Sequence, residues 1–264
     1  MKILFIGDVV GLPGCRFIKN NLMKIKGKYS IDVTIANGEN ASQNNGITAS
    51  CAEYIFGSGV DIITTGNHIF KQKKSICEYL KNNKRILRPA NYPKNTPGNG
   101  MLKFVFNNTK FCVINILGTV MLESLACPFE TLDNILENTG DCLIKIVDFH
   151  AEATSEKRAF GFYASNKVSA VFGTHTHVQT SDAQTISPGD MAYITDVGMT
   201  GTADSVLGVK KEISISRLKE KMPLRFEHET KGACKMECVV AEFDETNGKA
   251  LSIQNLIILD SDME

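Results

Sequence analysis

Five short apolar runs in this chain each end at side chains that can bind a metal ion. Runs of this length, followed by turn residues, predict β-strands. The side chains that follow the five runs are Asp8, then Glu39 with Asn40, then Asn67 with His68, then His150, and finally His175 with His177. Because strand ends in α/β folds open on one crevice, we expect these residues to meet at one edge of a sheet.

Each of these residues has an ordinary explanation when it is taken alone. Asp8 could cap the following helix, Glu39 could be a surface carboxylate, and His150 could be a core histidine. The pair His175 and His177 is the strongest local signal, because positions i and i+2 of an extended segment point the same way. Packing does not easily explain the same coincidence at five strand ends, so the pattern predicts a metal-dependent hydrolase.

The donor set also narrows the choice of metal. Imidazole, carboxylate and amide donors without thiolate suit iron, manganese, zinc or nickel better than copper or an iron–sulfur cluster. One Asp, one Glu, two Asn and three His exceed the needs of a single tetrahedral site. Two metal ions roughly 3.5–4 Å apart would use all of them if one carboxylate bridged the pair. Glu39, which is central in the motif order, is the predicted bridge.

The bulk composition argues against several other classes of protein. The formal charge is zero and the densest basic stretch covers only residues 71–74, so a long nucleic acid is disfavoured as a partner. Asp8 interrupts the N-terminal apolar run, which argues against a signal peptide, and no apolar stretch approaches the roughly 18 residues of a membrane span. None of the eight cysteines forms a Cys-x-x-Cys pair, and Cys234 and Cys238 are expected in the core. The cytoplasm is the predicted compartment.

Strand-like and amphipathic segments alternate through the first two thirds of the chain, which predicts βα units. Helices are expected at 17–27, with Gly27 as the stop, and at 48–56, 71–82 and 129–137. Further strands are expected at 103–106 and 112–117. The runs 236–243 and 251–259 flank Asn247-Gly248, which predicts an antiparallel hairpin. With 264 residues, 43% of them hydrophobic, the chain is expected to form one α/β domain, 1–264, with sheets inside and helices outside.

The order of the motifs resembles the calcineurin-like metallophosphoesterase superfamily. Gly-Asp, Gly-Glu-Asn, Gly-Asn-His, a lone His and Gly-Thr-His-x-His follow one another as in that superfamily. The chain departs from the pattern at Val10, where the superfamily has a histidine, and at Glu39, where it has an aspartate. These departures, together with segments 148–157 and 195–201, look like one bacterial subfamily, the YmdB-like phosphodiesterases. The similarity extends over essentially the whole chain.

The resemblance implies a four-layer α-β-β-α sandwich with two mixed sheets, and a dinuclear metal centre. It implies that Asp8, Glu39, Asn40 and His177 hold one ion, and that Glu39, Asn67, His150 and His175 hold the other. Asn40 would replace the ligand lost at Val10, and His68 would be the general acid. The implied metals are iron or manganese, with zinc, nickel or magnesium as alternatives. The implied substrates are small cyclic nucleotides, 2′,3′-cyclic and also 3′,5′-cyclic, rather than a long nucleic acid or a membrane.

Other functions stay open at this point. The chain could be a phosphomonoesterase or another metallohydrolase such as an amidohydrolase, although the late position of the His-x-His pair argues against the latter. It could also be a regulatory protein that senses a nucleotide with incidental turnover. Asp148 and Asp196 are candidates for orienting the ligand imidazoles, or are simply caps at strand ends. A homo-oligomer is compatible with the sequence.

Overall fold

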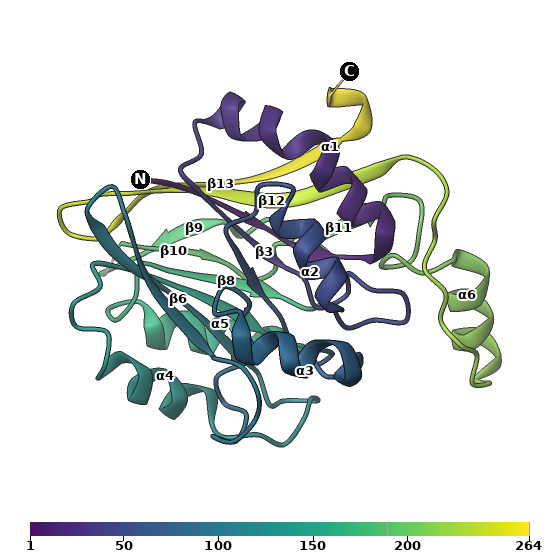
Figure 1. Ribbon diagram of the computed structural model, residues 1–264, viewed down its shortest axis with the longest axis horizontal. Helices are drawn as coiled ribbons and strands as arrows, with labels where there is room; N and C mark the ends of the chain where they lie inside the picture. The colour runs from purple at the N-terminus through teal and green to yellow at the C-terminus, as the bar shows by residue number, and fades with distance from the viewer. Residues whose placement is uncertain (189, 264) are drawn as a thin grey trace.

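Two β-sheets lie face to face in the computed structural model, and helices cover the outer face of each sheet (Figure 1). The structure describes residues 1–188 and 190–263. Among these residues, buried apolar side chains form separate cores between the first helices and the first sheet, between the two sheets, and between the second sheet and the remaining helices. The predicted four-layer α-β-β-α sandwich with two mixed sheets is confirmed.

The first sheet contains strands from both ends of the chain. Its strands are β1 Lys2–Ile6, β2 Asp8–Val9, β3 Val33–Asn37, β4 Ile62–Thr64, β11 Met199–Thr202, β12 Cys234–Phe243 and β13 Ala250–Leu259. Their order is β2-β11-β12-β1-β3-β4, with β13 paired to β12. β1 runs parallel to β3 and antiparallel to β12, so the sheet is mixed. The predicted C-terminal hairpin is the antiparallel pair β12 and β13.

The second sheet is parallel at its centre and antiparallel at its edges. Its strands are β5 Met101–Phe106, β6 Thr109–Leu117, β7 Ile144–His150, β8 Ala170–Thr174, β9 Gln184–Ile186 and β10 Met191–Ile194. The order is β5-β6-β7-β8-β10-β9, and the strands from β6 to β10 are parallel. The apolar alternation of β1 explains the stacking of the sheets. Ile3 and Phe5 face the second sheet, where Phe5 contacts Phe172, while Leu4 and Ile6 face the helices.

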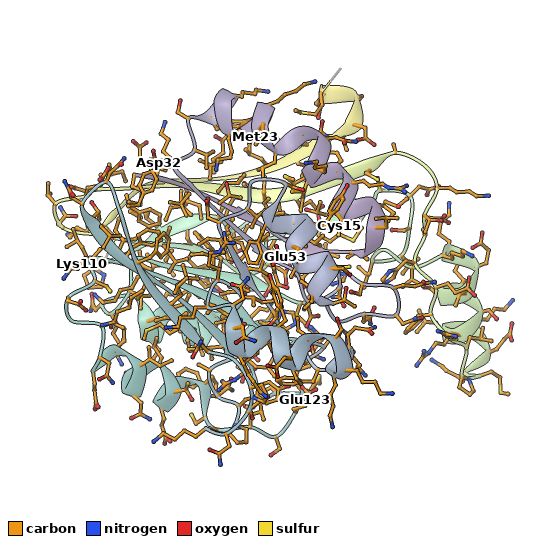
Figure 2. The ribbon with its side chains drawn as sticks, viewed as in Figure 1. Cys15, Met23, Asp32, Glu53, Lys110 and Glu123 are labelled. Carbon is orange, nitrogen blue, oxygen red and sulfur yellow. The ribbon has the colours of Figure 1, made fainter. Side chains whose placement is uncertain are left out.

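Helices fill the two outer layers. α1 Gly11–Tyr29, α2 Ala49–Phe56 and α3 Lys73–Asn82 cover the first sheet, and α4 Pro128–Leu136 and α5 Thr154–Ala164 cover the second. Figure 2 shows Cys15 on α1 and Glu53 on α2 among the side chains of the upper layer. α6 Lys211–Glu220 stands beside the layers, and a short 3-10 helix, Asp260–Met263, follows β13 (Figure 1). None of these helices has the length and hydropathy needed to cross a membrane.

The predicted helices are found with shifted ends, and the predicted stop at Gly27 is wrong. α1 runs through Gly27 to Tyr29 and ends where Ser30 adopts a left-handed φ of 56°. Gly27 faces open space, so nothing there forces the chain out of the helix. α2 begins as predicted, because the Thr48 side chain accepts a hydrogen bond from the Cys51 backbone N–H. Cys238 is buried in the core under α1, as predicted, whereas Cys234 is only partly buried and packs against that core.

Candidate metal centre

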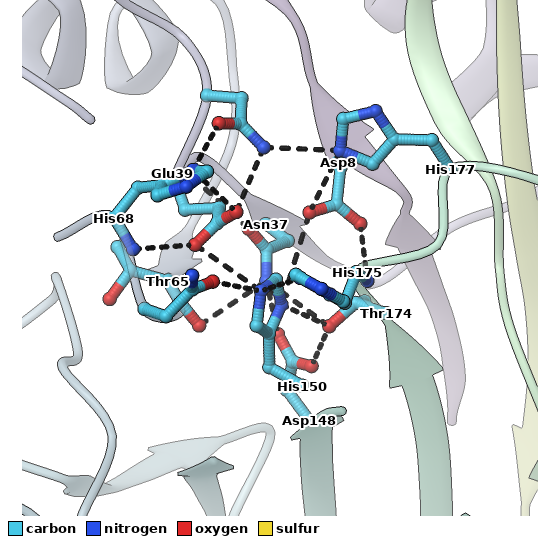
Figure 3. A network of polar contacts seen from close by, with 12 residues as sticks. Asp8, Asn37, Glu39, Thr65, His68, Asp148, His150, Thr174, His175 and His177 are labelled. Carbon is cyan, nitrogen blue, oxygen red and sulfur yellow. Dashed lines mark hydrogen bonds and ion pairs between the residues drawn. The ribbon is translucent and has the colours of Figure 1, made fainter. Parts of the chain in front are cut away.

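Three donor atoms from three other segments lie beside His150 Nε2 at one edge of the sandwich. His175 Nδ1 lies 3.0 Å and Glu39 Oε2 lies 3.2 Å from His150 Nε2 (Figure 3). Asn67 Oδ1 lies 3.2 Å from the same nitrogen. Ligand atoms about 2.0–2.2 Å from a metal ion are themselves about 2.9–3.4 Å apart. The spacing of these atoms therefore fits one metal ion, and we call them the His150 cluster.

A second group of donors lies on the other side of Glu39. Asn40 Nδ2 lies 3.1 Å from His177 Nε2 and donates a hydrogen bond of 2.8 Å to Glu39 Oε1. His177 Nε2 lies 3.7 Å from Asp8 Oδ1. Among the described residues, Asp8 Oδ1 is a buried carboxylate oxygen without a hydrogen-bond partner. A buried, unpaired carboxylate oxygen is costly unless a cation compensates it. We call Asp8, Asn40 and His177 the Asp8 cluster.

Glu39 connects the two clusters. Its Oε2 belongs to the His150 cluster and its Oε1 contacts Asn40. The carboxylate is fully buried at the end of β3, and the His68 backbone N–H donates to Oε2 at 3.1 Å. The structure thus brings together all eight residues that the sequence singled out: Asp8, Glu39, Asn40, Asn67, His68, His150, His175 and His177.

The expectation that His175 and His177 lie on an extended segment is wrong. Both have positive φ, 103° and 62°, which places them outside the extended region and directs them to different clusters. Two carboxylates hold this strained loop. The His175 N–H donates to Asp8 Oδ2 at 3.1 Å, and the Thr176 N–H donates to Asp196 Oδ2 at 3.0 Å. The backbone strain of these positive φ angles therefore occurs where the imidazoles of His175 and His177 must point to different clusters.

The buried ion pair of Lys157 and Asp196 stabilises the same loop. Lys157 Nζ donates to Asp196 Oδ2 and to the Thr174 carbonyl, both at 2.6 Å, and both charged side chains are almost fully buried. Sequence reasoning missed Lys157. A signal was present, because Lys157 shares the buried face of α5 with Phe160, Gly161 and Ala164.

Further side chains orient the ligand imidazoles. Thr174 Oγ1 lies 2.9 Å from His150 Nδ1 and donates to Asp148 Oδ1 at 2.7 Å, so Asp148 acts on His150 through Thr174. Glu152 Oε2 lies 3.0 Å from His175 Nε2, the ring nitrogen that faces away from the His150 cluster. Carboxylates and hydroxyls in such positions fix the tautomer and the ring orientation of a ligating histidine. The role of Glu152 was not predicted from the sequence.

Burial and charge shift the pKa values of this group strongly. Burial would raise the pKa of Glu39, but the imidazoles of His150 and His68 outweigh it and hold the pKa well below its usual range. Burial raises the pKa of Asp8. Burial would lower the pKa of His150, but Glu39 and the other carboxylates raise it to about 9. Burial, with repulsion from His150, lowers the pKa of His175 to about 3. The buried carboxylates therefore require positive charge beside them.

His68 lies at the margin of the clusters. Its Nδ1 is 2.9 Å from Asn40 Oδ1 and 3.3 Å from Glu39 Oε1, and its side chain is 23% exposed. With Nδ1 occupied in this way, Nε2 is the nitrogen left to contact a ligand. His68 lines a cavity of about 410 Å³, together with His175 and His177. This volume is within the usual range of small-molecule sites.

Val10 lies under a tight turn and lines the same cavity as His68 and His177. The turn is 206–209, in which Val206 and Val209 exchange two backbone hydrogen bonds of 2.9 Å. A side chain on Gly208 would come within 2.4 Å of Val10 Cγ1, so the turn packs directly on Val10.

Comparison with known proteins adds independent information. A family model described as YmdB-like protein matches residues 4–256. Over 100% of its length, the chain is 43% identical to a Bacillus subtilis (strain 168) protein named 2′,3′-cyclic-nucleotide 2′-phosphodiesterase, of which it covers 99%. It is 38% identical to a Mycoplasma pneumoniae protein named putative phosphatase/phosphodiesterase, over 99% of this chain and 94% of that one. A crystal structure of a phosphatase from Mycoplasma pneumoniae matches with a TM-score of 0.92 and 36% identity, over 98% of this chain and 93% of that one.

Proposed function

The chain belongs to the YmdB-like protein family, as its motifs predicted, and we propose that it is a metal-dependent phosphodiesterase that hydrolyses 2′,3′-cyclic nucleotides. The observation that supports the proposal most is the position of Glu39. Each oxygen of this one buried carboxylate faces a different group of nitrogen and oxygen donors. That arrangement suits a carboxylate that bridges two cations.

We infer that Asp8, Glu39, Asn40 and His177 hold one ion and that Glu39, Asn67, His150 and His175 hold the other. The imidazole, carboxylate and amide donors suit iron, manganese, zinc or nickel, and the resemblance to the metallophosphoesterases favours iron or manganese among these metals. Rotating the Asn40 amide by half a turn would direct its oxygen toward His177 and its N–H toward His68. The bound cations would attract the phosphoryl oxygens and lower the pKa of a water molecule toward about 7.

The side chains of the protein would carry out the remaining steps. The two donor clusters would position the cyclic phosphate. The carboxylates of Asp8 and Glu39 would contribute negative charge beside it. Water adds to phosphorus, the bond from phosphorus to O2′ breaks, and the departing ribose oxygen takes a proton from His68 Nε2. The product is a 3′-monophosphate. Glu39 Oε1 lies 3.3 Å from His68 Nδ1 and can accept a hydrogen bond from it while Nε2 carries the proton.

A substrate panel tests the proposed function. The metal-loaded protein should hydrolyse 2′,3′-cyclic AMP and release 3′-AMP, which chromatography distinguishes from 2′-AMP. The panel should include 3′,5′-cyclic AMP, which we propose as a second substrate, and 3′-AMP as a monoester. Turnover of the monoester alone would instead identify a phosphomonoesterase. Tight binding of the cyclic nucleotide with negligible turnover would identify a nucleotide sensor.

Replacing Gly66 by alanine should expel metal from the His150 cluster. The added carbon would lie 2.3 Å from His150 Nε2 and 2.4 Å from Glu39 Oε2, so both ligands would have to move. We expect at least one metal equivalent to be lost, as measured by elemental analysis. Gly27→Ala is the matched control, because nothing lies within 4 Å of its added carbon. It should keep the full metal content and gain up to about 1 kcal/mol of stability. Equal metal content in the two variants would contradict the proposed ligand positions.

A further inference from the structure

The cavity beside the metal-binding residues has an apolar wall that phosphodiester chemistry does not use. Leu207, Leu218 and Phe226 line it and are 45%, 65% and 43% exposed. All three come from the segment 203–229, which contains α6 and stands beside the four layers in Figure 1. Apolar side chains that line a cavity and are still largely exposed leave apolar surface for a ligand to cover.

The apolar wall is held in a fixed position relative to the metal-binding residues. Leu207 and Gly208 both have positive φ, 55° and 87°, as in a type I′ turn. The turn brings the Leu207 carbonyl within 3.1 Å of His177 Nδ1, the nitrogen of that ring that faces away from the Asp8 cluster. Farther along the segment, His228 Nε2 lies 3.1 Å from Asn45 Oδ1. The wall therefore keeps a set distance from the clusters.

Among the residues that the structure describes, Phe226 is the only Phe, Tyr or Trp that lines this cavity. The Arg217 guanidinium lies 4.2 Å from the centre of its ring and donates to the Leu224 carbonyl at 3.1 Å. The hydrogen bond fixes the guanidinium, and the guanidinium in turn fixes the ring. Phe226 thus offers a rigid, flat apolar surface in the same cavity as His68 and His177.

We propose that this wall binds the nucleobase of the substrate, with the base stacked on Phe226 beside Arg217. The inference rests on the proposed function, since it assumes that the phosphate lies at the donor clusters. A cyclic nucleotide has a charged end and a flat aromatic end, and the cavity has one wall suited to each. Stacking of a base on an aromatic side chain is insensitive to base identity, so Phe226 selects for the presence of a base.

The test compares 2′,3′-cyclic AMP with methyl riboside 2′,3′-cyclic phosphate, which has no base. The measured quantity is the ratio of kcat/KM for the two substrates, determined with the metal-loaded protein. In Phe226→Ala this ratio should fall by about 5- to 150-fold, mainly through a higher KM for cyclic AMP. Phe226→Trp should restore it. Met222→Ala is the matched control, because Met222 is exposed on the same segment and is absent from the cavity lining, and its ratio should equal that of the wild type.

An unchanged ratio in Phe226→Ala would overturn the inference, and so would an equal fall in Met222→Ala. Equal loss on both substrates would also overturn it, because Phe226 would then support folding or catalysis and not the base. These results are distinct from a failure of the proposed function, in which the wild-type protein would hydrolyse neither cyclic phosphate.

Discussion

Replacing His68 by alanine should lower kcat for 2′,3′-cyclic AMP by about 10²- to 10⁴-fold without changing the metal content. General acid catalysis typically contributes a factor of this size. His68 Nδ1 contacts Asn40 and Glu39, while its Nε2 is the nitrogen available to a substrate. The ribose oxygen is a poor leaving group unless it is protonated, so loss of the imidazole should slow the step in which the bond to phosphorus breaks.

A substrate with a good leaving group isolates this role. p-Nitrophenolate leaves without protonation, so His68→Ala should lose much less activity on bis(p-nitrophenyl) phosphate than on cyclic AMP. Elemental analysis of the same preparation checks the metal content. A loss of similar size on both substrates, or a loss of metal, would show that His68 does not act as the acid.

Replacing Lys157 by methionine should destabilise the fold by about 3–5 kcal/mol, the usual effect of removing one partner from a buried ion pair. The change leaves the Asp196 carboxylate buried beside its two remaining donors, the Thr176 and Gly198 N–H groups. It also leaves the Thr174 carbonyl without its lysine donor. Because Thr174 contacts His150 and Asp196 holds the His175–His177 loop, affinity for metal should fall as well.

Urea unfolding with a chelator present measures this effect without the added stability of bound metal. Lys167→Met is the matched control. Lys167 also lies 2.6 Å from a carboxylate, that of Asp133, but the two side chains are 33% and 47% exposed. An exposed pair of this kind contributes about 0–1 kcal/mol. If the two variants unfold at the same urea concentration, the buried pair does not have the structural role described here.

The strand ends made the fold and the position of the clusters predictable from the sequence. Asp8, Glu39 and His150 each follow a run whose side chains are buried on both faces of a sheet. β1 and β3 are neighbouring parallel strands of the first sheet, and β7 lies in the second sheet, so the carboxyl ends of strands from both sheets deliver these residues to one edge of the sandwich. The separation of the donors into two clusters agrees with the resemblance to the metallophosphoesterases, while the metal pair itself stays a proposal. The single domain 1–264 and the oligomeric state also stay predictions.

Other features depend on tertiary contacts that a local pattern does not contain. The positive-φ backbone at His175 and His177 is stabilised by Asp8, which lies near the start of the chain, and by Asp196, which follows β10. In the sequence, Lys157 resembles an ordinary surface lysine. Its burial results from the packing of α5 against β8. α1 passes through Gly27 because the packing of its apolar face outweighs the low helix propensity of one glycine.

Anomalous diffraction from crystals of the manganese-loaded protein tests the central claim most directly. We predict two peaks per chain, roughly 3.5–4 Å apart, with one Glu39 oxygen beside each. One of these peaks should lie at His150 and the other at Asp8. A single peak, or peaks remote from Glu39, would contradict the claim.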